Sequence, residues 1–164
     1  MNARVEMPED EPIVVITRTF DAPRELVWAA FTNPDHVAHW FGGPGFTSPV
    51  CSMDVRPGGL WRHVLRAPDG FEFSIESIFL DVVPPERLSW KNATEVHAPG
   101  APPAVTQTVT LHEDGARTHW RLEARYQSLS DRAVSVQMGF ATMITQSVER
   151  LADFLRHKDP GKEQ

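Results

Sequence analysis

The sequence predicts an α+β fold in which a curved antiparallel sheet of about six to seven strands surrounds a long C-terminal helix, with two short helices after the first strand. Residues 50–125 predict the sheet, because apolar side chains alternate there with a period of two between hairpin-sized turns. Residues 131–157 predict the helix, because their apolar side chains recur at steps of three and four. One helix covers only one face of a sheet, so the sheet has to curl around it and leave an internal space.

The N-terminal part predicts one strand followed by two short helices. Residues 13–20 (IVVITRTF) are rich in β-branched side chains, which is typical of a strand. Pro23 suits the first turn of a helix, and the apolar residues of PRELVWAAFTN follow the helical period. A second short helix, PDHVAHWF, ends at the glycine-rich residues 42–45.

The next strands are joined by tight turns. A short strand, CSMDV, precedes a turn at residues 56–59 (RPGG). The strand at residues 60–66 places on one face Trp61, His63 and Leu65. Asp69-Gly70 predicts a hairpin, and the strand at residues 71–83 is expected to place on one side Phe71, Phe73 and Ile75.

The remaining strands complete the sheet. One lies around Trp90, and two more, at residues 105–112 and 118–125, form a hairpin around the turn at residues 113–115 (EDG). The proline-rich segment from His97 to Ala104 predicts a loop.

Residues 12–157 are expected to form a single domain, because no repeat or long linker divides them. The acidic residues 1–11 predict a flexible N-terminal tail, and residues 158–164 a C-terminal tail. The single cysteine, Cys51, excludes an intramolecular disulfide and a multi-cysteine metal site. We expect it to pack as a small apolar side chain.

Composition and charge exclude several functional classes. With 41% hydrophobic and 23% charged residues, the chain is typical of globular proteins. The net charge of −6 argues against nucleic-acid binding and against docking on an anionic membrane, both of which need a basic face. No run reaches the ~18 apolar residues of a membrane-spanning helix, so no membrane insertion is expected. The first residues lack the apolar core of a secretory signal, which predicts a cytoplasmic protein.

Several motifs together resemble one family. Segments such as MDVRPGGLWRHVL, VVPPERLSW and MGFATMITQSVERLADFL come in the order and spacing found in the "activator of heat-shock protein 90 ATPase homologue, C-terminal-domain-like" family. This family lies within the SRPBCC (START, polyketide cyclase, pollen-allergen-like) superfamily. The resemblance runs from about Ile13 to Leu155, and it rests on the joint pattern of Pro23, Val27-Trp28, Trp40, Asp54, Arg56, Gly58-Gly59 and Pro85-Glu86-Arg87-Leu88.

The resemblance implies a helix-grip (START-like) fold with a cavity between the sheet and the last helix. It does not imply one activity, because the superfamily includes lipid carriers, cyclases, hydrolases and interaction domains. Two features depart from the pattern. Such proteins often carry Gly-Trp in the last helix, where this chain has Gly139-Phe140, and the loop from His97 to Ala104 is individual to this chain.

The candidate ligand-binding residues are mostly aromatic. Five tryptophans in so small a domain provide bulky, semi-rigid side chains of the kind that line cofactor-free pockets, although some of the rings are expected to be ordinary core. The candidates are Trp40, Phe46, Trp61, His63, Phe73, Trp90, Trp120, Phe140, Met143 and Ile144.

Other motifs have a structural explanation beside a functional one. His63 either orients a ligand or acts in acid–base chemistry, or else is a core histidine bonded to a neighbour. Asp54 and Arg56 precede two glycines, and a turn that needs positive φ explains them better than catalysis. His36 and His39 share a helix face, but no third imidazole joins them, so we expect surface side chains rather than a metal site. No catalytic residue and no cofactor is expected.

Three functions therefore remain open. The first is binding of a small hydrophobic or amphipathic molecule without a cofactor, by a monomer or homodimer. The second, implied by the resemblance, is a protein-interaction module that binds a chaperone or another protein partner. The third is a cofactor-free enzyme of the cyclase or hydrolase type, whose polar candidates are His63, Glu76, Gln107 and Glu123.

Overall fold

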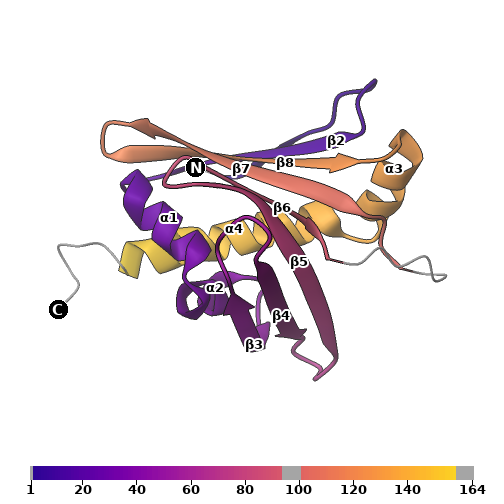
Figure 1. Cartoon of the computed structure of the whole chain (residues 1–164), viewed down its shortest axis with the longest axis horizontal. Coiled ribbons are helices and arrows are strands. Elements are labelled where there is room, and N and C mark those ends of the chain that lie inside the picture. Colours follow the sequence, from indigo (N-terminus) through magenta and orange to yellow (C-terminus); the bar gives the residue numbers. More distant parts are fainter. Residues whose placement is uncertain (1, 94–100, 158–164) are drawn as a thin grey trace.

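A computed structural model describes residues 2–93 and 101–157. It confirms the predicted α+β fold, with one curved, open antiparallel sheet and a C-terminal helix in the helix-grip arrangement (Figure 1). Residues 1, 94–100 and 158–164, which include the first half of the predicted loop and the predicted C-terminal tail, lie outside the described residues. The elements in chain order are β1 (Arg4–Glu6), β2 (Ile13–Phe20), α1 (Arg24–Thr32), α2 (Pro34–Trp40), β3 (Thr47–Met53), β4 (Leu60–Arg66), β5 (Glu72–Val83), β6 (Arg87–Asn92), β7 (Val105–Asp114), β8 (Arg117–Tyr126), α3 (Leu129–Gln137) and α4 (Phe140–His157).

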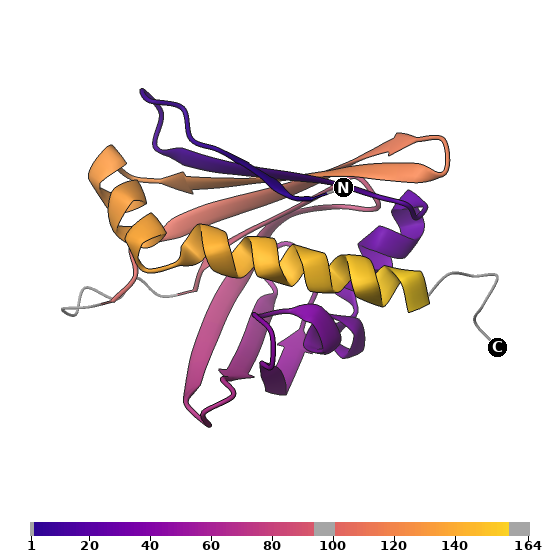
Figure 2. The same ribbon diagram turned by 180° about the vertical axis from the view of Figure 1, so that it is seen from behind.

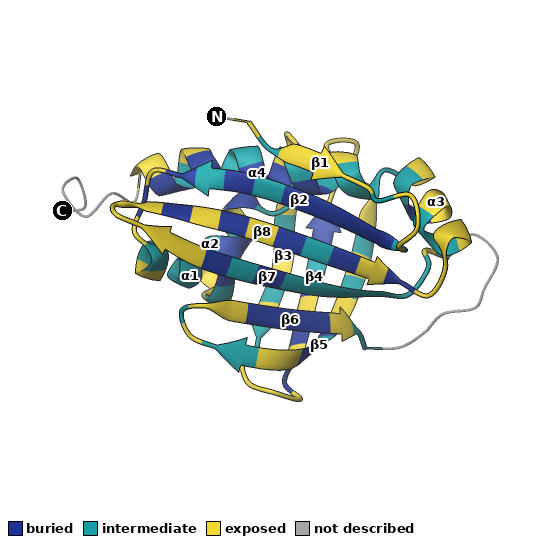
Figure 3. Cartoon of the chain, turned by 90° about the horizontal axis from the view of Figure 1, so that it is seen from above, coloured by how far each residue is buried: buried dark blue, intermediate teal, exposed yellow. Residues whose placement is uncertain are grey.

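The eight strands form one sheet in the order β1-β2-β8-β7-β6-β5-β4-β3. A register shift between Phe79 and Val82 interrupts the pairing of β5 with β6, and such bulges bend a strand. The strands β3 and β4 and the first half of β5 accordingly turn away from the plane of β2, β8 and β7 (Figure 1). Buried and exposed residues alternate along β8, as they must where one face of a sheet is solvated (Figure 3).

Helix α4 lies against the concave face of the sheet, and its two halves have different neighbours. Its C-terminal half lies beside α1 and α2, which both contact it (Figures 1 and 2). Leu151 and Leu155 are buried there. Its N-terminal half, which carries Phe140 and Ile144, faces the sheet without these helices in between. The short helices therefore fill one end of the space under the sheet and leave the other end to the N-terminal half of α4.

The single helix predicted from residue 131 onward is wrong in one respect. The structure divides it into α3 and α4, because Gly139 has a φ of +96°, a left-handed conformation that ends a helix. The apolar period continues across this break, so periodicity alone did not reveal it. Ser128 begins α3 as an N-cap, its hydroxyl accepting a hydrogen bond from the Asp131 N–H at 3.0 Å.

Two further expectations need correction. Residues 1–11 are not wholly a tail, since Arg4–Glu6 pairs with β2 as an edge strand and raises the strand count to eight. The Ala3 N–H also donates to the Glu149 carboxylate at 3.0 Å, which ties this segment to α4. Phe71 does not lie inside with Phe73, because it precedes β5 in the hairpin and is 65% exposed.

Candidate functional site

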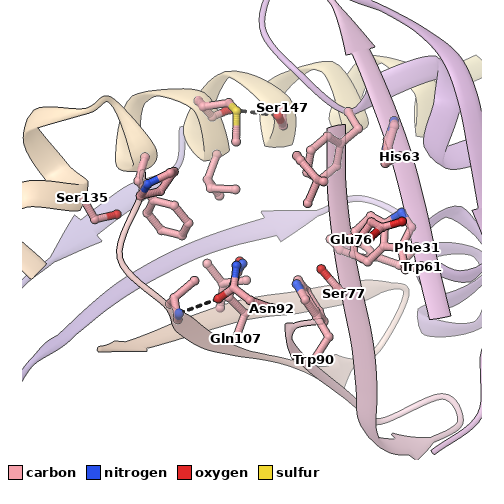
Figure 4. Close-up of a pocket in the computed structure, with 18 of the residues that line it drawn as sticks. Phe31, Trp61, His63, Glu76, Ser77, Trp90, Asn92, Gln107, Ser135 and Ser147 are labelled. Carbon is pink, nitrogen blue, oxygen red and sulfur yellow. Dashed lines mark hydrogen bonds between the residues drawn. The ribbon is translucent and has the colours of Figure 1, made fainter. Parts of the chain in front are cut away.

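The structure contains a partly enclosed pocket of about 400 Å³ between α4 and the concave face of the sheet. This volume lies within the range of about 300–1,000 Å³ that is typical of small-molecule sites. Strands β4 to β8 form one wall and the N-terminal half of α4 forms the opposite wall. Phe31 and Trp40 from the short helices also line the pocket, and Phe31 lies beside Trp61 at one end of it (Figure 4).

Aromatic rings make up much of the pocket wall. Trp61 is the centre of this wall, because its ring stacks on Phe79 at 6.0 Å and meets Trp90 edge-on at 5.4 Å. Phe31 packs against both Trp40 and Trp120, with centroids 4.8 and 5.9 Å apart. These ring pairs support one another's positions in the wall.

The pocket opens beside the first half of β5. Strand β6 ends at Asn92, opposite Ser77, so no strand in the described parts of the chain pairs with residues 72–76 on that side. Three of the lining residues are exposed, Ser74, Glu76 and Pro102, and they mark the mouth. The mouth thus lies between β5 and residues 102–104, which lead into β7.

Three uncharged polar side chains interrupt the apolar wall on neighbouring strands (Figure 4). Ser77 of β5 lies directly opposite Asn92 of β6, and Gln107 of β7 lies opposite Trp90. The Asn92 Oδ1 accepts a hydrogen bond from the Val105 N–H at 2.7 Å. Its amide N–H₂ group and the side chains of Ser77 and Gln107 have no hydrogen-bond partner among the described residues, so they can form hydrogen bonds with a bound molecule.

His63 lies at the side of the pocket and is 1% exposed. Its Nε2 is 2.8 Å from the Ser48 hydroxyl, and its Nδ1 is 4.0 Å from the Cys51 sulfur on the paired strand β3. Burial lowers the pKa of His63 to about 4 and raises the pKa of Cys51 to about 11. At neutral pH the pair is therefore an uncharged imidazole beside a protonated thiol, which is the opposite of an activated cysteine nucleophile.

The structure brings eight of the ten candidate residues to the pocket. These are Trp40, Trp61, His63, Trp90, Trp120, Phe140, Met143 and Ile144. Phe46 and Phe73 do not line it. They pack edge-on against each other, with centroids 6.3 Å apart, because Phe73 lies near the β4–β5 hairpin, beyond the mouth.

Several lining residues were not among the candidates, notably Phe41, Ser77 and Asn92. The polar ones leave a signal in the sequence. Ser77 follows Phe73 and Ile75 on the inward face of β5, and Asn92 follows Leu88 and Trp90 on that of β6, so each interrupts an apolar alternation. Gln107 interrupts β7 in the same way, and the sequence had indicated it only as a polar residue for a catalytic role.

The remaining motifs have structural roles. Arg56 Nε donates to the Asp54 carboxylate at 2.8 Å in an exposed turn, and Gly58 adopts a φ of +84° there. The rings of His36 and His39 pack on Phe154, with centroids 5.3 and 5.9 Å away. No group of three or more potential metal ligands occurs in the part of the chain that the structure describes. Among the same residues, no helix is long and apolar enough to cross a membrane.

Comparisons with known proteins agree with this architecture. The structure of protein NE0264 from Nitrosomonas europaea is 26% identical, with a TM-score of 0.82 over 92% of this chain and 98% of that one. Protein Ms6760 from Mycobacterium smegmatis is 23% identical, with a TM-score of 0.81 over 93% and 95%. A protein from Arthrobacter aurescens is 22% identical, with a TM-score of 0.83 over 94% and 91%. The comparison with curated proteins gives no match.

A family model covers most of the chain. The model described as "Activator of Hsp90 ATPase homolog 1-like protein" matches residues 21–156, which extend from the end of β2 to the end of α4. This match confirms the resemblance drawn from the sequence motifs. The chain belongs to the family of Activator of Hsp90 ATPase homolog 1-like proteins.

Proposed function

We propose that the protein binds a small, largely apolar molecule in the pocket between α4 and the sheet. The observation that carries this proposal is an unfilled space of about 400 Å³ walled by buried aromatic rings. Native interiors are close-packed, and large apolar voids in them are costly to stability. A pre-formed aromatic pocket with a mouth to the surface is what a ligand-binding protein requires.

The alternatives are less well supported. An interaction module needs no internal space, whereas here the pocket lies where core side chains would otherwise meet. An acid–base or nucleophilic enzyme needs activated groups. Burial lowers the pKa of His63 to about 4, which makes it a weak base, and raises the pKa of Cys51 to about 11, which keeps it a thiol. We therefore assign the pocket to binding.

Fluorescence titration with N-phenyl-1-naphthylamine, an uncharged apolar probe, tests the proposal. Four of the five tryptophans line the pocket, so a probe bound there quenches tryptophan emission as it saturates about one site. Trp61→Ala removes ring contacts and is expected to weaken probe binding about tenfold, which corresponds to about 1.4 kcal/mol.

Trp28→Ala is the matched control. Trp28 is half-buried on α1 and packs against the core, but it does not line the pocket. This variant should lose stability and keep wild-type probe affinity. Phe140→Ala, at a half-buried lining position, provides a second pocket variant if Trp61→Ala fails to fold. Probe signals that never saturate, or equal losses in the Trp28 and pocket variants, would contradict the proposal.

A further inference from the structure

Three polar side chains of the pocket wall, on β5, β6 and β7, are electrically neutral. Ser77 offers a hydroxyl, Asn92 its amide N–H₂, and Gln107 a whole amide, and none of these groups is bonded to another described residue. They lie side by side on β5, β6 and β7 (Figure 4). Together they provide several donors and at least one acceptor within an otherwise aromatic surface.

Among the described lining residues, no charged side chain is available to pair with a charged ligand. The lining includes no lysine or arginine, and its one carboxylate, Glu76, accepts a hydrogen bond from Arg62 Nε at 3.1 Å on the outer face of the sheet. His63 is held by Ser48 and is uncharged at neutral pH. As far as the described residues show, the site therefore contains hydrogen-bonding groups but no counter-ion.

These lining groups favour a neutral ligand over an ionised one. An ionised carboxylate or phosphate that leaves water for this pocket loses its hydration and gains no cation, which costs several kcal/mol. A neutral carbonyl or hydroxyl loses much less hydration, and Ser77, Asn92 and Gln107 can replace those hydrogen bonds.

We propose, building on the function inferred above, that the ligand is an uncharged apolar molecule with a hydroxyl, ketone or ester oxygen. That oxygen bonds to the side chains of Ser77, Asn92 and Gln107. The rest of the molecule lies between the tryptophan rings and the N-terminal half of α4.

Displacement of N-phenyl-1-naphthylamine by matched ten-carbon compounds tests this ligand class. Decan-1-ol and methyl decanoate are neutral at pH 7.5, whereas decanoic acid is ionised. We expect the two neutral compounds to displace the probe at concentrations at least tenfold lower than decanoate. Ser77→Ala should weaken the binding of the neutral compounds about threefold to tenfold, which is the effect expected from the loss of one hydrogen bond. Ser52→Ala, the same change on an exposed residue of β3 outside the pocket, should leave them unchanged.

Water holds ionised decanoate more strongly than the neutral compounds, so weak decanoate binding by itself does not show that the pocket lacks a counter-ion. Gln107→Lys provides the reciprocal test, because it adds a positive charge to the pocket. Gln107 is half-buried, so the longer lysine side chain can keep its ammonium hydrated. This variant should bind decanoate at least tenfold more tightly than the wild type does and should lose its preference for the neutral compounds.

The outcomes separate the two proposals. If wild-type protein binds decanoate as tightly as decan-1-ol, or if Ser77→Ala and Ser52→Ala behave alike, the uncharged-ligand proposal is wrong while pocket binding stands. If the probe itself shows no saturable binding, the proposed function fails, and the ligand class fails with it.

Discussion

Acidification tests the environment of His63 directly. The imidazole is 1% exposed, and burial lowers its pKa from 6.5 to about 4. In the unfolded chain the same group takes up a proton near pH 6.5. Between these two values the unfolded state binds a proton that the native state does not, so the free energy of unfolding falls as the pH falls.

The expected loss follows from the two pKa values. A difference of about 2.5 pH units corresponds to about 3 kcal/mol once the pH is below 4. About 2 kcal/mol of this is lost between pH 7.5 and pH 5, where most carboxylates remain ionised and the Cys51 thiol remains protonated. This pH window therefore isolates the histidine from the other groups around it.

Urea unfolding of wild type and His63→Gln at a series of pH values measures the effect. Glutamine stays neutral and can still hydrogen-bond to Ser48. The variant should be less stable than wild type at pH 7.5, but its free energy of unfolding should depend less on pH. The difference in the free energy of unfolding between wild type and His63→Gln should decrease by about 2 kcal/mol from pH 7.5 to pH 5. A difference that stays constant over this range would show that His63 takes up its proton as readily in the native as in the unfolded state, and the desolvation argument would be refuted.

Two further comparisons can be made by thermal or urea unfolding. Phe140→Ala should lower the free energy of unfolding by less than about 3 kcal/mol, because Phe140 is half-buried beside the pocket. Leu151→Ala should lower it by about 3–4 kcal/mol, because Leu151 lies in the packed core. Equal losses in the two variants would contradict this expectation. Gly59→Ala should destabilise by more than about 3 kcal/mol, because its Cβ would lie within 1.9 Å of the Asp54 carbonyl oxygen. Gly58→Ala should cost only about 1 kcal/mol, since its φ of +84° is strained but no atom lies within 4 Å.

The fold could be predicted because local patterns and family motifs agreed. Residues 60–66 form β4 as predicted, and Trp61, His63 and Leu65 are buried on its inner face. Side chains alternate between the two faces of a strand, so only two assignments of the inner face are possible. Three inward residues in one strand are enough to choose between them. The break at Gly139 was missed because one residue with positive φ redirects a helix without disturbing the apolar period around it.

The candidate site was predicted less completely, because a pocket depends on where the fold leaves space. Aromatic content pointed to Trp40, Trp90 and Trp120, which all line the pocket. It pointed equally to Phe46 and Phe73, whose position beyond the mouth depends on how β5 bends. Composition identifies bulky rings, but only the arrangement of the strands separates a pocket wall from ordinary packing.

The position of the pocket has a simple physical origin. The concave face of the sheet is longer than α1 and α2 can cover, and both short helices pack beside the C-terminal half of α4. There the apolar residues of α4, such as Leu151 and Leu155, are buried. Toward its N-terminus the same apolar face continues through Ile144 to Phe140, where strand β6 of the opposite wall ends at Asn92. Apolar surface extends beyond the elements that could fill it, and the unfilled part is where we place the ligand.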